Sequence, residues 1–260
     1  MKKLIVIGNP ISHSLSPKLH NYWIQKEKIK AIYDKKLLEK EELEENILEI
    51  KKGNIFGMNV TIPFKKLVIP LLDGLTSNAQ ITQSVNTIYL DKNKVYGDNT
   101  DIFGFVTPLK DFGFVGDNKQ ALILGAGGVS ASIIIALKNL GVSKINLMNR
   151  TKQNAIEIKN MFKDIEVKNW GEKVDFDIVV NCTSLGLNNE DIGIDFSDIK
   201  DKIFYDIIYK PKTKFLINAE KNNKIINGKM MFIYQAQKSF EIWHGILPTI
   251  DTDVVELIND

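Results

Sequence analysis

Ala121-Leu122-Ile123-Leu124-Gly125-Ala126-Gly127-Gly128-Val129-Ser130 is the stretch that decides the fold. Its first four residues are all apolar, which predicts a short strand buried on both faces. The residues from Gly127 to Leu140 then predict a helix. Gly125 permits a tight turn between strand and helix, and Gly127 has no Cβ, so a pyrophosphate can approach the backbone at the helix N-terminus. This order predicts a dinucleotide site at Gly125, Ala126, Gly127, Gly128 and Val129. A glycine-rich turn of a flavodoxin-like fold without a nucleotide is the alternative.

The turn after the next expected strand indicates which dinucleotide is bound. A NAD site carries Asp or Glu about 20 residues past the glycines, where it accepts a hydrogen bond from the ribose 2′-OH. This chain has Asn149-Arg150-Thr151-Lys152 there and no carboxylate. Arg150 can hold a 2′-phosphate through two parallel hydrogen bonds and stack on the adenine, Thr151 can donate a hydroxyl and Lys152 adds charge. Arg150 is the only arginine beside 33 lysines. A solvated basic turn is the alternative, but the position favours NADP.

The composition excludes several classes of protein. The 260 residues carry 34 basic and 32 acidic side chains, which gives a formal net charge of +2. The charges are spread along the chain, so neither its first hundred residues nor the remainder is the basic domain that nucleic-acid binding favours. No apolar run approaches the roughly 18 to 20 residues that span a bilayer. Cys182 is the only cysteine and His13, His20 and His244 are scattered, which argues against disulfides and metal sites. The apolar stretch in Met1–Gly8 is too short for a signal peptide, so we expect a first strand in a cytoplasmic protein.

Alternating strands and helices predict two α/β domains. Parallel pairing with crossover helices is expected in the first hundred residues, with strands at Leu4–Ile7, Ala31–Lys35, Ile55–Val60, Val85–Leu90 and Lys94–Tyr96 and helices at Pro17–Lys28, Glu39–Lys51 and Phe64–Leu72. A helix at Asp101–Phe112 leads to strands at Ala121–Leu124, Lys144–Met148, Ile178–Asn181 and Ile203–Ile208, with a helix at Asn154–Phe162. Helices at Met231–Gly245 and Asp253–Ile258 are expected to return to the first domain. We therefore expect a substrate-binding and catalytic domain at 1–101, with 231–260 packed on it. A doubly wound, Rossmann-like NADP-binding domain is expected at 102–230, the two facing a cleft.

Polar side chains follow the expected strands of the first domain. Ser14 and Ser16 are two residues apart, so in an extended segment both hydroxyls face the same way and suit a carboxylate; a plain N-cap is the alternative for Ser16. Lys65 closes Asn59-Val60-Thr61-Ile62-Pro63-Phe64-Lys65, beyond the carboxyl end of a strand, where open α/β sheets bind ligands. Further polar groups lie in Val85-Asn86-Thr87 and Gly97-Asp98-Asn99-Thr100-Asp101. The alternative for Asp101 is a simple cap of the following helix.

These motifs together resemble those of the shikimate dehydrogenase family, the NADP-dependent enzymes of aromatic biosynthesis. They span nearly the whole chain: Gly8–Pro17, Asn59–Lys65, Val85–Thr87, Gly97–Asp101, Gly125–Ser130, Asn149–Thr151 and Trp243-His244-Gly245. The resemblance implies an oxidoreductase that reversibly reduces 3-dehydroshikimate to shikimate with NADPH, on the way to chorismate and the aromatic amino acids. It also implies NADP as the cofactor, no metal, no nucleic-acid or membrane partner, and a monomer or homodimer.

The resemblance also implies a role for individual residues. Lys65 and Asp101 form the catalytic pair, with Lys65 as general acid and base. The substrate is bound by Ser14, Ser16, Thr61, Asn86, Tyr209 and Gln235. Cofactor contacts fall on Gly125, Ala126, Gly127, Gly128 and Val129 at the pyrophosphate, on Asn149, Arg150, Thr151 and Lys152 at the 2′-phosphate, and on Ser77, Ile207 and Gly228. Without the resemblance, these last three would be interpreted as a turn residue, a core residue and a tight bend. Asn154 stands where the family often has a further basic residue, so cofactor discrimination is expected to rest more heavily on Arg150.

Three alternatives remain at this point. A quinate/shikimate dehydrogenase that uses NAD or both cofactors is opposed by the Arg150 turn. A methylene-tetrahydrofolate dehydrogenase shares a related two-domain layout but fits the serine pair and the Asn-Thr-Asp motif less well. A non-catalytic NADP-sensing paralogue is opposed by the presence of both Lys65 and Asp101.

Overall fold

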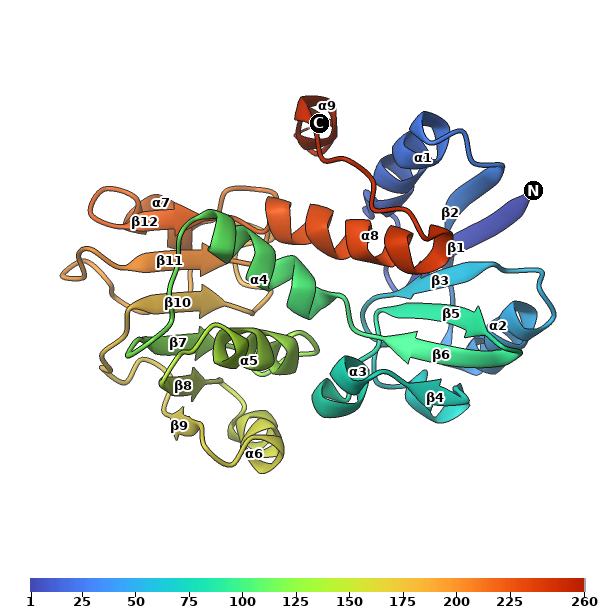
Figure 1. Cartoon of the computed structure of the whole chain (residues 1–260). Coiled ribbons are helices and arrows are strands. Elements are labelled where there is room, and N and C mark those ends of the chain that lie inside the picture. Colours follow the sequence, from blue (N-terminus) through green and yellow to red (C-terminus); the bar gives the residue numbers. More distant parts are fainter. Residues whose placement is uncertain (260) are drawn as a thin grey trace. The chain divides into compact units, whose positions relative to one another are not determined.

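The computed structural model describes residues 1–259 and divides into two compact units. The first unit is Met1–Gly104 together with residues 233–259, and the second is Phe105–Phe232. Each unit contains a six-stranded sheet, and the two sheets and the helices around them are labelled in Figure 1. No helix within residues 1–259 has the length and apolarity needed to cross a membrane.

The sheet of the first unit mixes parallel and antiparallel pairs. Its strands are β1 (Lys2–Gly8), β2 (Ala31–Leu37), β3 (Gly57–Val60), β4 (Gly74–Leu75), β5 (Thr87–Asp91) and β6 (Lys94–Asp98), in the order β2-β1-β3-β5-β6-β4. The expected parallel pairing holds for β1 with β2 and β3, but β5 runs antiparallel to both β3 and β6. For β5 and β6 the reason is a two-residue turn in which Lys92 and Asn93 both have positive φ, the backbone of a tight hairpin, since a parallel crossover needs a dozen residues or more.

The helices of the first unit follow the expected pattern except in two places. They are α1 (Ser16–Lys26), α2 (Leu43–Lys51), α3 (Ser77–Thr82) and α9 (Thr252–Leu257), with short 3₁₀ turns η1 (Lys40–Glu42) and η2 (Ile69–Leu71). The helix predicted at Phe64–Leu72 is wrong, because this stretch is a series of turns that contains only η2. Pro70 lies inside the stretch, and a proline there lacks the N–H that an α-helix needs. Sequence reasoning also missed the six-residue helix α3 and the two-residue strand β4.

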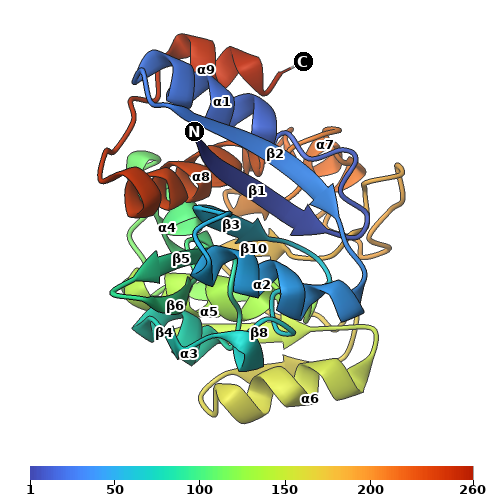
Figure 2. The same cartoon turned by 90° about the vertical axis from the view of Figure 1, so that its right-hand side faces the viewer.

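The C-terminal segment packs within the first unit. α8 (Lys229–His244) carries Trp243, whose indole N–H donates to the carbonyl of Ile88 at 3.0 Å. Gly57 makes room for this ring, because a Cβ at Gly57 would meet the indole at 2.3 Å. Figure 2 shows α9 beside α1, and the indole N–H of Trp23 on α1 donates to the carbonyl of Thr249. The C-terminal segment is thus joined to β5 and α1 of the first unit.

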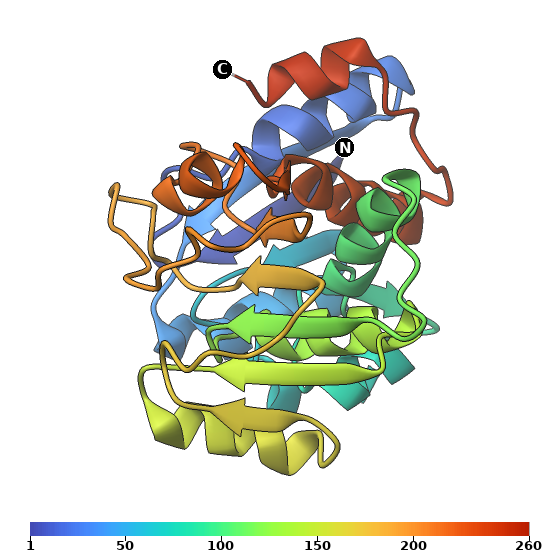
Figure 3. The same cartoon turned by 90° about the vertical axis from the view of Figure 1, so that its left-hand side faces the viewer.

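The second unit is a doubly wound parallel sheet, seen in Figure 3. Its strands are β7 (Gln120–Leu124), β8 (Lys144–Met148), β9 (Glu166–Lys168), β10 (Ile178–Asn181), β11 (Ile203–Asp206) and β12 (Lys224–Ile226), in the order β12-β11-β10-β7-β8-β9. Its helices are α5 (Ser130–Asn139), α6 (Lys152–Met161) and α7 (Lys214–Ala219), and α4 (Asp101–Asp111) enters it from the first unit. Every pair of neighbouring strands is parallel, and the order reverses beside β7, the Rossmann arrangement that the sequence predicts. β9 and β12 were not expected, since each has only three residues, and neither was α7, whose six residues make fewer than two helical turns.

One histidine is buried in the core of the first unit without a polar partner. His20 on α1 is 1% exposed, and its ring stacks on Tyr33 at a centroid distance of 4.2 Å. Neither ring nitrogen has a hydrogen-bond partner among the described residues. Burial, with a smaller contribution from nearby His244, lowers the pKa of His20 to about 3. The folded chain therefore holds this imidazole neutral, whereas the unfolded chain protonates it near pH 6.5.

The first unit should lose stability as the pH falls below about 6.5. A lowered folded-state pKa means that the stability is fully present above the unfolded-state pKa and is lost as the pH falls toward the folded-state pKa. His20 should therefore contribute a slope of about 1.4 kcal/mol per pH unit between pH 6.5 and about pH 4.5, below which carboxylates begin to titrate. Urea denaturation at pH 7, 6 and 5 measures this slope.

His20→Phe keeps an aromatic ring in the core and should flatten the slope in this window. His244, whose pKa is also lowered, to about 4, accounts for part of what remains. His13→Gln is the control, because its side chain is exposed. An equal slope in wild type and His20→Phe would show that His20 is not buried as a neutral ring.

Candidate active site

An ion pair between Lys65 and Asp101 lies at the carboxyl-end edge of the first sheet. The Lys65 ammonium donates to Asp101 Oδ2 at 2.6 Å, and the two side chains are 16% and 7% exposed. Two contacts fix the backbone of Lys65. The neighbouring Phe64 is buried in the core, and the N–H of Val85 donates to the Lys65 carbonyl at 2.9 Å. The turns that replace the expected helix therefore fix this lysine firmly.

Asn86 fixes the other oxygen of the same carboxylate. Its Nδ2 donates to Asp101 Oδ1 at 2.9 Å, and its Oδ1 accepts from the backbone N–H of Thr100 at 2.8 Å. The backbone N–H of Asp101 donates to Asn99 Oδ1, so Asn99 caps the start of α4 and the Asp101 carboxylate is left for Lys65 and Asn86. The alternative of Asp101 as a simple helix cap is therefore wrong.

Ser14 lies after the end of β1, and Ser16 is the first residue of α1. Ser16 is buried and Ser14 is half-buried, and the backbone N–H of Ser16 donates to Ser14 Oγ at 3.3 Å. α1 begins at Ser16, with Leu15 in the cap position and no side-chain capping hydrogen bond. The Ser16 hydroxyl is instead hydrogen-bonded to Tyr33, whose pKa is raised by burial. The alternative of Ser16 as a plain N-cap is therefore not what the structure shows.

Thr61 and Gln235 are partly exposed residues of the first unit. Thr61 follows β3, and its backbone N–H donates to the carbonyl of Ile7. Gln235 lies on α8, and its carbonyl accepts from the hydroxyl of Ser239 at 3.0 Å. Ser239 in turn contacts Asn59, and Asn59 Oδ1 accepts from the Tyr33 hydroxyl at 2.6 Å. Sequence reasoning missed Tyr33 and Ser239, because neither belongs to a motif at a strand end.

In the second unit the glycine turn follows β7, as the sequence predicts. Gly125 has φ +105°, and a Cβ there would meet Thr183 at 2.9 Å. A Cβ on Gly127 would meet nothing closer than 3.9 Å, and one on Gly128 nothing within 4 Å. The folded chain itself thus requires glycine only at the first position. The open space at the next two suits an external group such as a pyrophosphate at the start of α5.

The structure also gives a physical role to Ser130. Its hydroxyl donates to the carbonyl of Gly125 at 2.8 Å and accepts from the N–H of Gly127 at 3.0 Å. A side chain thus closes the turn where the usual fingerprint has a third glycine. Burial raises the pKa of the Cys182 thiol, which lies beneath the turn, so this cysteine stays protonated and inert.

Asn149 joins the glycine turn to the basic turn after β8. Its Oδ1 accepts from the N–H of Ala126 at 3.0 Å, and its Nδ2 donates to the carbonyl of Thr151 at 2.7 Å. Arg150 is exposed and has no ion pair among residues 1–259. Thr151 precedes α6 without making a capping hydrogen bond, and Lys152 is the exposed first residue of that helix. The structure thus brings the predicted pyrophosphate and 2′-phosphate residues together on one edge, and their donors fit NADP.

Two more predicted residues of the second unit lie against each other. A Cβ on Gly228 would meet the carbonyl oxygen of Ile207 at 2.0 Å, so only glycine allows this approach. The preceding residue, Asp206, is fully buried and accepts from the Ile208 N–H, from Asn181 and from Thr213. Burial raises the pKa of Asp206.

The remaining two predicted residues, Tyr209 and Ser77, belong to different units. Tyr209 stacks on Phe232 at 5.0 Å in the second unit, and burial raises its pKa. Ser77 is the exposed first residue of α3 in the first unit. No contact between Ser77 and another predicted site residue is found among residues 1–259.

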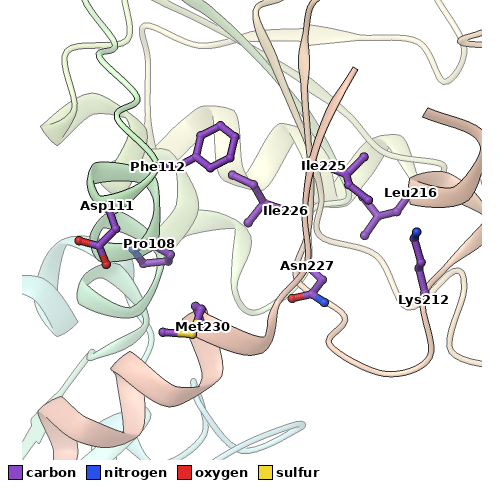
Figure 4. A pocket seen from close by; sticks show the side chains of 9 residues that line it. All are labelled: Pro108, Asp111, Phe112, Lys212, Leu216, Ile225, Ile226, Asn227 and Met230. Carbon is purple, nitrogen blue, oxygen red and sulfur yellow. The ribbon is translucent and has the colours of Figure 1, made fainter. Parts of the chain in front are cut away.

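A separate surface pocket of about 540 Å³ lies in the second unit. Figure 4 shows its lining, which comes from α4, α7, β12 and the start of α8: Pro108, Asp111, Phe112, Lys212, Leu216, Ile225, Ile226, Asn227 and Met230. None of the predicted site residues lines it, so this pocket does not mark the candidate site.

Comparison with known proteins agrees with the geometry. Residues 6–88 match the family described as shikimate dehydrogenase substrate binding domain, and residues 110–188 match shikimate / quinate 5-dehydrogenase. A curated shikimate dehydrogenase (NADP(+)) of Pelagibacter ubique is 56% identical over 262 residues, which cover 99% of each chain. The chain belongs to the shikimate dehydrogenase family.

Solved structures of this family share the whole fold. The crystal structure of shikimate dehydrogenase from Aquifex aeolicus has a TM-score of 0.92 at 39% identity and covers 100% of this chain and 98% of its own. The Thermus thermophilus shikimate 5-dehydrogenase, in complex with NADP(H) and shikimate, has a TM-score of 0.91 at 28% identity and covers 100% and 99%. The resemblance inferred from the motifs and the predicted two-domain α/β fold class are thus confirmed.

The two kinds of glycine should respond differently to alanine. Gly228→Ala should lower the free energy of unfolding by about 2 kcal/mol, because its Cβ would meet backbone that cannot move aside. Gly127→Ala should leave the free energy within roughly 0.5 kcal/mol of wild type, because its Cβ would meet open space. Urea denaturation measures both, and equal losses would contradict the assignment of Gly127 as a residue kept small for a ligand.

Proposed function

We propose that this chain is an NADP-dependent oxidoreductase that interconverts 3-dehydroshikimate and shikimate. The observation that carries the proposal is the Lys65–Asp101 pair, buried at a sheet edge and held by Asn86. The name of the Pelagibacter relative, shikimate dehydrogenase (NADP(+)), and the ligands of the Thermus structure support the choice of substrate and cofactor. The first unit, with residues 233–259, is the substrate-binding and catalytic part, and the second unit binds NADP.

Lys65 is the general acid in the direction of reduction. An ammonium has three N–H donors, and the contact with Asp101 uses one of them, so two remain for a substrate oxygen. Bound NADPH supplies the hydride to the carbonyl carbon. Lys65 polarises the carbonyl oxygen and gives a proton to the alkoxide that develops there, and in the reverse direction neutral Lys65 takes that proton back.

Asp101 and Asn86 keep the Lys65 ammonium in position relative to the substrate. Asp101 Oδ2 accepts from Lys65, while Asn86 holds Oδ1, so the carboxylate cannot rotate away from the ammonium. Thr61, Asn86 and Gln235 bind the substrate hydroxyls. Ser14 and Ser16 bind its carboxylate, with Tyr209 nearby.

The second unit holds the cofactor through residues of three turns. Gly125–Val129 binds the pyrophosphate, whereas Asn149, Arg150, Thr151 and Lys152 bind the 2′-phosphate. The support for this assignment is the open space above Gly127 and the exposed guanidinium of Arg150 next to Asn149. Ile207, Gly228 and Ser77 complete the cofactor contacts.

Lys65→Ala should lower kcat for shikimate oxidation by about 10²- to 10⁴-fold, with a much smaller change in KM. The reason is that the substitution removes the proton donor and acceptor but leaves the substrate-binding side chains in place. Absorbance of NADPH measures the rate, with shikimate and NADP run beside quinate and NAD.

Lys66→Ala is the matched control, because Lys66 is the exposed neighbour of Lys65. It should turn over shikimate like the wild type. A kcat for Lys65→Ala equal to that of Lys66→Ala would refute the role of Lys65, and a wild type that prefers quinate with NAD would refute the proposed substrate and cofactor.

Arg150→Ala should raise KM for NADPH at least 10-fold and change KM for NADH far less, because only NADPH carries the 2′-phosphate. Arg150→Lys should recover only part of the loss, since an ammonium cannot make two parallel hydrogen bonds. Steady-state kinetics with both cofactors provides the comparison. Equal changes for NADPH and NADH would place Arg150 elsewhere than at the 2′-phosphate.

A further inference from the structure

A fully buried hydroxyl on α8 joins the candidate catalytic pair to a separate part of the substrate site. Ser239 is 0% exposed and lies four residues after Gln235. Its Oγ contacts Thr87 Oγ1 at 2.7 Å, Asn59 Nδ2 at 3.1 Å and Thr100 Oγ1 at 3.2 Å. It also donates to the Gln235 carbonyl at 3.0 Å. Four groups from a helix, two strands and a loop thus meet at one oxygen.

Two short routes lead from this oxygen to the catalytic pair. Thr87 Oγ1 lies 3.0 Å from Asn86 Oδ1, and Thr100 contacts both ends of the Asn86 amide. Asn86 then donates to Asp101, which holds Lys65. The rotation of the Asn86 amide therefore depends on hydroxyls that are themselves fixed by Ser239.

The remaining contacts of Ser239 reach other predicted substrate residues. The hydrogen bond to the Gln235 carbonyl fixes the turn of α8 from which the Gln235 side chain projects. Asn59 accepts from the Tyr33 hydroxyl, and Tyr33 is hydrogen-bonded to Ser16. The hydroxyls and amides that link these residues, on Ser239, Thr87, Thr100, Asn86 and Asn59, are buried. A buried polar network holds a unique geometry only while each member keeps its partners.

We propose that Ser239 is a positioning residue, which sets the Asn86–Asp101–Lys65 geometry and the Gln235 side chain relative to each other. This inference rests on the proposed function. Ser239 touches neither substrate nor cofactor. Its effect passes through Asn86 on one side and through the backbone of Gln235 on the other.

Ser239→Ala removes the hydroxyl and changes little volume. It should lower kcat for shikimate oxidation about 10-fold and raise KM for shikimate about 3-fold, because small misplacements of reacting groups reduce rates strongly. KM for NADP should stay within about 2-fold, since the network lies in the first unit. Circular dichroism and thermal unfolding establish that the variant is folded.

A double-mutant cycle separates positioning from a general loss of stability. In an Asn86→Ala background, Ser239→Ala should cost less than about 2-fold in kcat, because the group through which it acts is already gone. A purely structural serine would give the same fold-loss in both backgrounds.

Gln237→Met is the matched control on the same helix. Gln237 is buried and donates to the carbonyl of Pro248 at 2.7 Å, with no contact to the network around Ser239. It should retain wild-type kcat and KM for shikimate. A loss in Gln237→Met equal to that in Ser239→Ala would overturn the proposal, since any damage to α8 would then suffice.

Thr87→Val keeps the proposal testable if Ser239→Ala does not fold. It removes the hydroxyl at the other end of the 2.7 Å contact and places a β-branched residue in β5, where such residues pack well. The same fall in kcat supports the proposal. Wild-type kcat in either folded variant overturns it while leaving the proposed function standing, whereas a wild type inactive on shikimate refutes the function and this inference together.

Discussion

The buried carboxylate of Asp101 is the constraint on which the first unit depends. A carboxylate taken out of water is costly unless charge and hydrogen bonds compensate it. Here the compensation comes from Lys65 in the turns after β3 and from Asn86 just before β5, while Asn99 accepts from the backbone N–H of Asp101 at the start of α4. The antiparallel hairpin of β5 and β6 brings the last two together, because it pairs Thr87 with Asp98. A wholly parallel sheet would separate Asn86 from Asp101, so the feature of the fold that the sequence pattern missed is the one that builds the site.

The second unit uses the opposite device. The residues proposed to bind its ligand are accessible: they include glycines with open space around them and an exposed guanidinium. Hydrogen bonds within the unit fix the turns that carry these residues. Ser130 closes the glycine turn and Asn149 bridges it to the Arg150 turn. In the proposed function, the first unit prepares a charged group for proton transfer by burying it among fixed partners. The second unit prepares a surface for a large anionic cofactor by keeping backbone and side chains accessible at the carboxyl ends of its strands.

Local patterns predicted the parts of the fold whose causes are local. The strand β7, the turn at Gly125 and the helix ended by Gly141 follow from residues that are adjacent in sequence, and so do the ends of β8 and β10. The sequence patterns missed the antiparallel pairing of β5 and several short elements. β12 and α7, for example, are too short to show a hydrophobic periodicity and are fixed by tertiary contacts. Within the site, motifs at strand ends identified Lys65, Asn86 and Asp101. They did not identify Ser239, since its importance depends on which face of α8 meets the sheet, and that face is set by packing of distant segments.

The only arginine shows how composition and structure inform each other. The ion pairs within residues 1–259 all use lysine as the cation, including the buried pair with Asp101. A point charge therefore serves as the cation in every ion pair of the described part of the chain. Arg150 makes none of these pairs and lies exposed beside the glycine turn, so nothing in residues 1–259 requires its planar fork. This agrees with the proposed contact of Arg150 with the 2′-phosphate, because a phosphate that accepts two parallel hydrogen bonds distinguishes arginine from lysine.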